Sequence, residues 1–347
     1  MKLVKSHYLA DGKLYNHGQE TLLVQVEAPE DYDVLLGNIL SSGYYDRGYF
    51  EQHSGLRERR KVPHFWAVAR MIQALGPRSV LDVGCGRGDV LALLHARGVG
   101  VTGIDFSEDV REAAWPEIRP HYLAGDFGER CRELARAGRR FDTVCALDIW
   151  EHLHPRRLQD YLEALVSVAS PDALFFFVVP AFGTDRVFGE QFPLEFEENR
   201  ARFDAREPFD FLCLERTEPP IPASGHLIWA HTQWWERQFA RHGLERVEPV
   251  ERRLHAVFDP LLPHSVRSFY VFRRDAGASV HRTRDVLPGP ARLHQARLPL
   301  ELWRDARAGV ISLSGEGQEL PRQALRSTTP PAVRGAWRGL RQRLKRG

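Results

Sequence analysis

The chain has 347 residues, of which 43% are hydrophobic and 27% are charged. This composition is typical of folded globular proteins, and the length suits one large domain with additions or two small domains. Residues 333–347 carry six basic residues and no acidic one, so removing those charges from the net charge of +2 leaves −4 over residues 1–332. Because residues 1–332 carry a net negative charge, the sequence argues against a nucleic-acid-binding protein.

Localisation and metal content are predicted from what the sequence lacks. The first twelve residues contain no apolar signal segment, and the longest apolar run, Ala173–Val179, is too short to cross a bilayer. None of the four cysteines lies in a CxxC or Cys/His pair, which favours reduced, buried thiols: they are Cys85, Cys131, Cys145 and Cys213. We therefore expect a cytoplasmic protein without a bound metal.

Residues 1–60 precede the first strongly patterned segment. A strand is predicted over Glu20–Glu27, and little else in this region is regular. An aromatic cluster follows around two glycines, and it either covers a ligand or packs on the core: Tyr44, Tyr45, Tyr49 and Phe50. Residues 63–75 then show the broad apolar face of a helix, which Gly76 and Pro77 end.

The segment Ser79–Asp105 has the pattern of a nucleotide-binding βαβ unit. A buried strand over residues 80–83 is followed by glycines at alternate positions and then by a helix that begins near Asp89. A second strand ends at Asp105. Because Asp89 occupies the place of the third glycine, the dinucleotide pattern GxGxxG is not met, which disfavours an NAD-dependent enzyme.

The pattern present is instead DxGxGxG, formed by Asp82, Gly84, Gly86 and Gly88. It resembles motif I of the class I S-adenosylmethionine-dependent methyltransferases. A carboxylate at this turn would repel a pyrophosphate but suits the ammonium and sulfonium of S-adenosylmethionine. The resemblance implies that Asp82 and the glycine turn with Cys85 hold this cofactor, and that Asp105, followed by Phe106, accepts hydrogen bonds from its ribose hydroxyls.

Two later strand ends extend the resemblance. A third strand over residues 121–124 leads to Asp126 and Phe127, which by resemblance contact the adenine amino group and ring. A fourth strand, Phe141–Leu147, is followed by the run D-x-x-E-H-L from Asp148 to Leu153. This run is similar to the motif after strand four in ubiquinone-pathway-like and related small-molecule methyltransferases, and it adds Asp148 to the cofactor residues.

The remaining pattern predicts a doubly wound, Rossmann-like α/β fold. After a fifth strand over residues 173–180, the residues up to Thr232 show no clear periodicity but many phenylalanines. We interpret residues 181–231 as a substrate lid, with a dimerisation arm as the alternative. A helix over residues 232–242 and strands over 244–251 and 268–273 follow. The resemblance implies a seven-stranded sheet, mostly parallel, with the last strand antiparallel.

The domain organisation follows from these boundaries. Residues 1–60 form a covering segment and residues 61–275 the methyltransferase domain. Residues 276–347 form an Arg/Pro-rich tail that ends in a basic amphipathic helix over residues 333–347. One interpretation is that this helix attaches the protein to an anionic membrane surface, such as the inner membrane face, or to an acidic partner. The alternative is that it packs on its own domain.

The chemistry expected of this family is in-line transfer of a methyl group from sulfur to an acceptor. A hydroxyl acceptor gains from a base near neutrality, and His152 and His226 are the candidates. Runs such as G-H-L at residues 225–227 look like methyltransferases of bacterial glycan synthesis, so we expect a small-molecule or saccharide hydroxyl. The alternatives are a non-catalytic S-adenosylmethionine-binding module and an N- or C-methyltransferase acting on a quinone- or lipid-like molecule.

Overall fold

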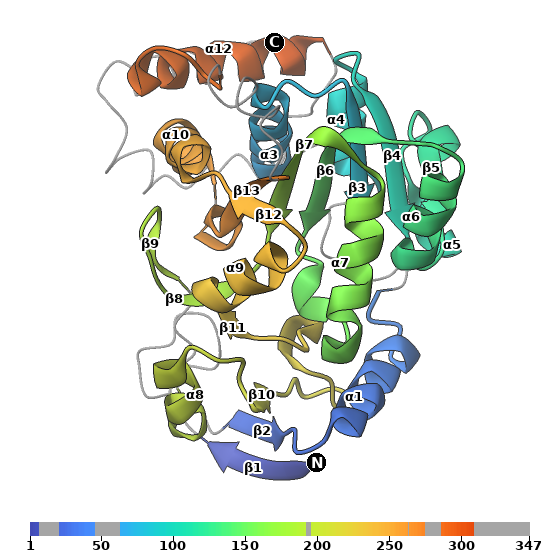
Figure 1. The fold of residues 1–347 in the computed structure, drawn as a ribbon, viewed down its shortest axis with the longest axis vertical. Coiled ribbons are helices and arrows are strands. Elements are labelled where there is room, and N and C mark those ends of the chain that lie inside the picture. The colour runs from blue at the N-terminus through green and yellow to red at the C-terminus, as the bar shows by residue number, and fades with distance from the viewer. Residues whose placement is uncertain (7–20, 46–62, 192–195, 263, 275–285, 309–347) are drawn as a thin grey trace.

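The structure is a computed structural model, and it describes residues 1–6, 21–45, 63–191, 196–262, 264–274 and 286–308. Tyr49, Phe50 and the basic segment 333–347 lie outside the described residues. Within them, the chain forms a large α/β body, with a smaller group of elements at one end of its sheet (Figure 1).

The central sheet has seven strands in the order β12-β13-β7-β6-β3-β4-β5. Their bounds are β3 Ser79–Val83, β4 Gly100–Asp105, β5 Tyr122–Ala124, β6 Phe141–Leu147, β7 Ala169–Val178, β12 Leu244–Arg246 and β13 Phe269–Arg274. Strands β3 to β7 pair in parallel, and β13 runs antiparallel to both β7 and β12. The predicted doubly wound sheet with a reversed last strand is confirmed.

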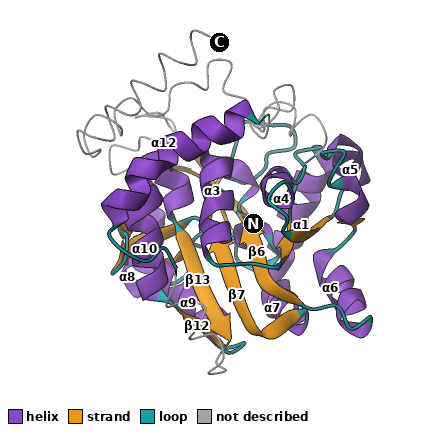
Figure 2. Ribbon diagram, turned by 90° about the horizontal axis from the view of Figure 1, so that it is seen from above, coloured by secondary structure: helices purple, strands orange, loops and turns teal. Residues whose placement is uncertain are grey.

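Both faces of this sheet are buried under helices, as Figure 2 shows from above. Alternate residues of one strand enter different cores: Phe175 and Phe177 of β7 pack with α6, α7 and α9, whereas Phe176 packs with α3, α4, α10 and α12. A strand buried on both faces is continuously apolar, which explains the run at residues 173–179. The helices are α3 Pro63–Ala74, α4 Asp89–His95, α5 Glu108–Ala113, α6 Phe127–Arg136, α7 Leu158–Ser167, α9 Thr232–Ala240, α10 Glu248–Phe258 and α12 Ala291–Arg307.

The N-terminal region is more regular than the sequence suggests. Besides the expected strand, observed as β2 Thr21–Gln25, it contains β1 Lys2–Ser6 and α1 Pro29–Ser41. Strand β2 pairs on one side with β1 and on the other with β10 Phe211–Cys213 of the 181–231 segment. The two regions therefore build one small sheet, at the end of the molecule toward which the parallel strands point (Figure 1).

The described residues of the 181–231 segment contain several strands and a helix and do not form one long loop. These elements are β8 Ala181–Asp185, β9 Gly189–Gln191, α8 Arg200–Ala205, β10 and the short β11 Ala230–His231. Phe182 stacks on Phe203 and Phe209, with ring centroids 5.4 and 4.3 Å apart. These phenylalanines join the buried cluster that covers one face of the main sheet, so aromatic content here reflects packing and gives no evidence for a substrate surface.

A buried ion-pair network fixes the β8–β9 hairpin to the main sheet. Arg246 of β12 contacts Asp185 at 2.7 Å and Glu251 at 2.7 Å, and the side chains of all three are at most 4% exposed. The guanidinium also lies 4.9 Å from the ring centroid of Tyr270. Each buried charge thus has an opposite charge beside it, as burial requires.

One prediction about the C-terminal part is wrong, and a second segment holds a helix that was not expected. The strand expected over residues 244–251 ends at Arg246, and α10 begins at Glu248, because Pro249 lacks the amide hydrogen of a strand but suits a first helical turn. The tail expected from residue 276 contains α12, where Leu298 and Leu302 are 6% and 1% exposed. Asp305 accepts a hydrogen bond of 2.7 Å from the Trp66 indole of α3, which ties α12 to the domain.

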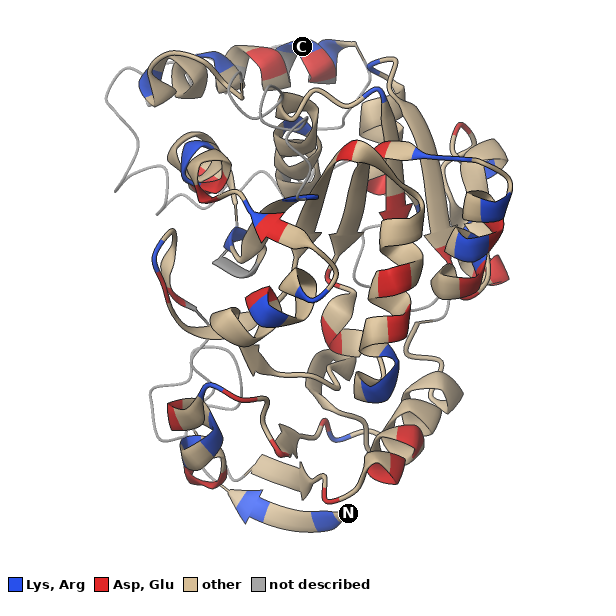
Figure 3. Ribbon diagram, in the orientation of Figure 1, with Lys and Arg blue, Asp and Glu red and all other residues tan. Residues whose placement is uncertain are grey.

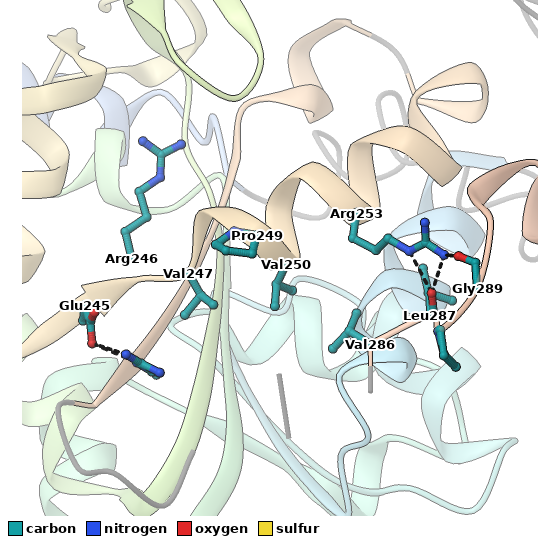
Figure 4. A pocket seen from close by; sticks show the side chains of 11 residues that line it. Glu245, Arg246, Val247, Pro249, Val250, Arg253, Val286, Leu287 and Gly289 are labelled. Carbon is teal, nitrogen blue, oxygen red and sulfur yellow. Dashed lines mark hydrogen bonds and ion pairs between the residues drawn. The ribbon is translucent and has the colours of Figure 1, made fainter. Parts of the chain in front are cut away.

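One cavity of about 550 Å³ lies between β12, α10 and residues 286–289 (Figure 4). Arg253 closes one side by donating to the backbone carbonyl of Leu287 at 2.7 Å, and Glu245 pairs with Arg273 at 2.7 Å. None of the predicted cofactor or catalytic residues lines it, so it is separate from the candidate site.

The surface of the described elements agrees with the charge count. Figure 3 shows acidic and basic residues next to one another on α8, α10 and α12. Across the described ranges, no helix is both long and apolar enough to serve as a membrane span.

Candidate active site

The glycine turn joins β3 to α4 in a conformation that needs glycine. Gly84, Gly86 and Gly88 have φ angles of 68°, 51° and 75°, in the left-handed region. A side chain on Gly84 would also collide with Ile149, whose Cδ1 lies 1.9 Å from the position of a Cβ atom. Two separate constraints, backbone conformation and close approach of Ile149, therefore act at Gly84.

Asp82 and Asp105 lie on either side of this turn, at the ends of β3 and β4. Asp105 accepts a hydrogen bond of 2.8 Å from the amide of Gly86, which ties the two strand ends together. Both carboxyls are buried, and one oxygen of each, Oδ1, has no hydrogen-bond partner within the described part of the chain. Two buried acceptors without donors at one turn fit a ligand that brings donors or positive charge.

The raised pKa values of Asp82 and Asp105 also favour a ligand that brings donors or positive charge. Burial, reinforced by the charge of Asp105, raises the pKa of Asp82 to about 7. Burial also raises the pKa of Asp105, although backbone amides at Gly86, Ser107 and Phe106 partly offset the shift. A cationic or hydroxyl-rich ligand would stabilise both ionised forms.

The neighbours of these acids differ in exposure. The Sγ atom of Cys85 lies 2.6 Å from where a Cβ on Gly103 would stand, and burial raises the pKa of its thiol well above the usual value. Phe106 is 53% exposed, which is unusual for a phenylalanine, and its ring lies 6.0 Å from that of Tyr45. Cys85 is thus placed for packing rather than reaction, whereas Phe106 presents an open apolar face beside Asp105.

Asp126 and Phe127 lie after β5, as expected, and both take part in packing. Asp126 caps α6 by accepting from the amide of Glu129 at 3.1 Å, and its Oδ2 accepts from the Tyr161 hydroxyl. The Phe127 ring packs on Tyr161 with a centroid distance of 4.4 Å. If Asp126 contacts adenine, its carboxylate must do so while it also accepts hydrogen bonds from Glu129 and Tyr161.

Asp148 follows β6 in a strained conformation, with a φ of 54°. Its side chain is exposed, yet the surrounding protein raises its pKa to about 6 by displacing water from the carboxylate. Left-handed backbone outside glycine is often retained at functional sites.

The two candidate histidines, His152 and His226, meet at Glu151. Their Nε2 atoms lie 3.7 and 3.8 Å from Glu151 Oε1, and their ring centroids are 4.7 Å apart. Glu151 is fully buried, and neither of its oxygens has a hydrogen-bond partner among the described residues. Burial, with the charge of Asp148, raises the pKa of Glu151, whereas burial lowers the pKa of His152 to about 4 and that of His226 as well.

Tyr45 connects this cluster to Phe106, the residue after β4. Its hydroxyl lies 2.6 Å from His152 Nδ1, and its ring contacts Phe106. His152 Nδ1 is also 3.1 Å from the backbone carbonyl of Gly225. Nδ1 of His152 thus has a hydroxyl and a carbonyl within hydrogen-bond distance, while its Nε2 faces Glu151.

The structure brings together most of the predicted site and adds residues that the sequence did not single out. Glu151 stands inside the D-x-x-E-H-L run but is distinguished only by its burial, and Tyr45 was one of several aromatic residues. His231, which also precedes α9, is not part of the cluster, because its Nδ1 accepts the amide of Gln233 at 3.0 Å and caps that helix.

Comparisons with known proteins show the family to which the chain belongs. Residues 56–249, more than half of the chain, match the family described as "Methyltransferase domain". A ubiquinone biosynthesis O-methyltransferase of Azorhizobium caulinodans is 35% identical over 97 residues, covering 26% of this chain and 37% of that protein. The enzyme of the same name from Coxiella burnetii is 31% identical over 93 residues, covering 26% and 39%.

The chain thus spans less than half the length of these curated relatives. Among solved structures, a 1,6-didemethyltoxoflavin-N1-methyltransferase of Burkholderia thailandensis is similar at 18% identity, with a TM-score of 0.45, over 79% of this chain and all of that one. The family match, together with the acids and glycines of the turn, identifies the chain as a member of the methyltransferase domain family, of the class I S-adenosylmethionine-dependent type.

Proposed function

We propose that the chain transfers a methyl group from S-adenosylmethionine to a hydroxyl of a small molecule or saccharide. The observation that carries this proposal is the position of the Glu151–His152–His226 cluster: Glu151 and His152 come shortly after β6, and Tyr45 links His152 to Phe106 at the end of β4. Methylation of oxygen requires removal of a proton, and this cluster is the group of titratable side chains placed to assist it. The relatives named as O-methyltransferases support the same choice of acceptor atom.

The residues of the turn fit the cofactor. The free Oδ1 of Asp105 is available to ribose hydroxyls, and Asp82 supplies negative charge near the positive groups of the ligand. Gly84 and Gly88 keep side chains out of the turn, so that the ligand approaches the backbone. Asp148 and the exposed ring of Phe106 extend the surface available to the cofactor. When bound, S-adenosylmethionine supplies a methyl group that is electrophilic without further activation.

The two histidines act within the cluster rather than as isolated bases. With its pKa at about 4, His152 is neutral at pH 7 and weakly basic when alone. Burial and the charge of Asp148 raise the pKa of Glu151, which lies between the two imidazoles. We assign to the cluster as a unit the promotion of proton loss from the acceptor, with His152 and His226 as the histidines it depends on.

The test is methyl transfer from labelled S-adenosylmethionine to two sets of acceptors, one of phenols and one of saccharides. The proposal expects label in a methyl ether and loss of most activity in His152→Ala and His226→Ala, while the affinity for S-adenosylhomocysteine is kept. Label attached to nitrogen or carbon, or full activity in both variants, would contradict it. A protein that binds the cofactor and methylates neither set would favour a binding module.

A separate proposal concerns residues 333–347, which lie outside the described residues. We propose, from their sequence alone, that they attach the protein peripherally to an anionic membrane surface. Vesicles containing anionic lipid should sediment the full chain but not a chain ending at residue 332, and equal sedimentation would refute the proposal.

A further inference from the structure

The Glu151–His152–His226 cluster is incomplete as it stands. Glu151 is 0% exposed and sits between two imidazoles that are too far away to donate hydrogen bonds to it, at 3.7 and 3.8 Å. Both carboxylate oxygens and Nδ1 of His226 have no partner in the described ranges. Burying a carboxyl without any partner is costly, and folded proteins rarely leave three such atoms in one place.

The spacing of these groups matches the ligand set of a metal ion. One donor atom from each of the three residues lies within 4.8 Å of the other two. Nitrogen and oxygen ligands lie about 2.0–2.2 Å from a zinc-sized ion, so ligands of one ion stand at most about 4.4 Å apart. The observed separations from Glu151 Oε1 fall below that limit, and one ion would neutralise the carboxylate while using both imidazole lone pairs.

The surroundings of His152 support the same interpretation. Metal-binding histidines usually donate their second ring N–H to a carbonyl or carboxylate, which fixes the tautomer. His152 has this arrangement, because its Nδ1 faces the Gly225 carbonyl at 3.1 Å and its Nε2 faces Glu151. The backbone at Ser224, beside Gly225, is left-handed with a φ of 58°, so strained backbone holds that carbonyl in place.

We propose that Glu151, His152 and His226 form a binding site for a single divalent transition-metal ion, with Zn²⁺ as the reference ion. Two imidazoles and one carboxylate suit Zn²⁺, Co²⁺ or Fe²⁺ better than Mg²⁺ or Ca²⁺, which prefer oxygen ligands. Three protein ligands leave at least one coordination position open. The sequence predicted no metal because its cysteines are unpaired, and the third ligand comes from the distant 181–231 segment.

The site has a direct consequence for methyl transfer, and this consequence rests on the proposed function. A hydroxyl bound at the open position of a divalent ion has a lowered pKa, so its proton leaves to water at neutral pH. The acceptor would then reach the reaction as an oxyanion. Under this proposal, His152 and His226 contribute as ligands, and a free imidazole base is not needed.

The test is metal binding by the full chain, after chelation and without any acceptor. Calorimetry with Zn²⁺ and visible spectroscopy with Co²⁺ should show one ion per chain. Glu151→Gln and His226→Gln should each weaken Zn²⁺ binding by about a hundredfold or more. The matched control is His242→Gln, because His242 bonds to Gln159 and is not part of the cluster.

Binding of S-adenosylhomocysteine by the same variants separates this inference from the proposed function and also reports folding. The inference predicts that cofactor affinity stays within about twofold of native while Zn²⁺ affinity falls. Zn²⁺ binding that is absent from the native chain, or that is unchanged in both cluster variants, would overturn the metal site. A native chain that binds Zn²⁺ but not S-adenosylhomocysteine would contradict the proposed function and support the metal site.

Discussion

At the scale of single residues, Asp82 is the clearest case of a group placed for a ligand at a cost to the fold. It is buried, its Oδ1 has no partner within the described residues, and its pKa is about 7. A carboxyl whose pKa is higher in the folded than in the unfolded chain, where it is about 3.9, binds more protons when folded. The free energy of unfolding therefore falls as the pH rises from about 4 to about 7.

We predict that Asp82→Asn removes this pH dependence. At pH 8, without ligand, the variant should unfold at a higher temperature than the native protein, by an amount corresponding to about 1–3 kcal/mol. Below about pH 3 the difference should vanish, because Asp82 is then protonated in both states. Cofactor affinity should fall. Thermal unfolding at several pH values checks this, and a native protein more stable than the variant at pH 8 would contradict it.

The residue scale also shows what a sequence predicts about a site. Asp82 and Asp105 were identifiable because each ends a strand at a fixed distance from the glycine turn. Glu151 was not, because its importance depends on burial beside His226, which lies on a different segment. Asp126 matched the motif by position, yet its helix cap and the Tyr161 contact become visible only in three dimensions.

At the scale of elements, the glycine turn tests whether close packing against Ile149 matters beyond backbone conformation. Gly84 and Gly98 have φ angles of 68° and 78°, but only at Gly84 does a Cβ meet another atom within 4 Å. We predict that Gly98→Ala costs only the strain of a left-handed residue, about 1–2 kcal/mol. Gly84→Ala should cost more and should abolish cofactor binding.

The double variant Gly84→Ala/Ile149→Ala distinguishes the two causes. Removing the Ile149 side chain should recover the part of the stability loss due to collision, which denaturant unfolding measures as a coupling between the two sites. If Gly84→Ala and Gly98→Ala destabilise the protein equally, the contact with Ile149 is not a constraint on the turn.

Elements with strong local patterns were predicted well, and the others were not. Residues 141–147 were predicted and observed as a strand, since a continuous apolar run between polar turns has few alternatives. Residues 248–258 were missed as a helix, although Val250, Leu254 and Val257 have helical spacing. The apolar residues just before Pro249 predict a strand, whereas Pro249 belongs to the first turn of the helix that follows.

At the scale of the whole molecule, strands that are far apart in the sequence pair with one another, and local sequence patterns do not predict these pairs. Strand β2 joins β1 to β10 across nearly two hundred residues, so the N-terminal region and the 181–231 segment share a sheet. Such pairing depends on which strand edges remain free after the main sheet has formed. The order of the main sheet, by contrast, came from the resemblance to a known family.

Helix α12 shows that the domain extends beyond its expected end at residue 275. We predict that Leu302→Ala, which removes a side chain that is 1% exposed, destabilises the protein by about 2–5 kcal/mol. Leu300→Ala on the same helix, where the side chain is 53% exposed, should change stability by less than about 0.5 kcal/mol. Denaturant unfolding measures both, and equal effects would show that α12 is not docked.

The most direct test of the account is calorimetric titration of S-adenosylhomocysteine into the native chain and Asp105→Ala. Asp109→Ala serves as the control because Asp109 is exposed on α5, and NADH serves as the control ligand. Losing hydrogen bonds to a charged acceptor costs about 1.5–3 kcal/mol each, so affinity should fall more than tenfold in Asp105→Ala alone. Native binding that is absent, or that does not depend on Asp105, would contradict the assignment of the cofactor site.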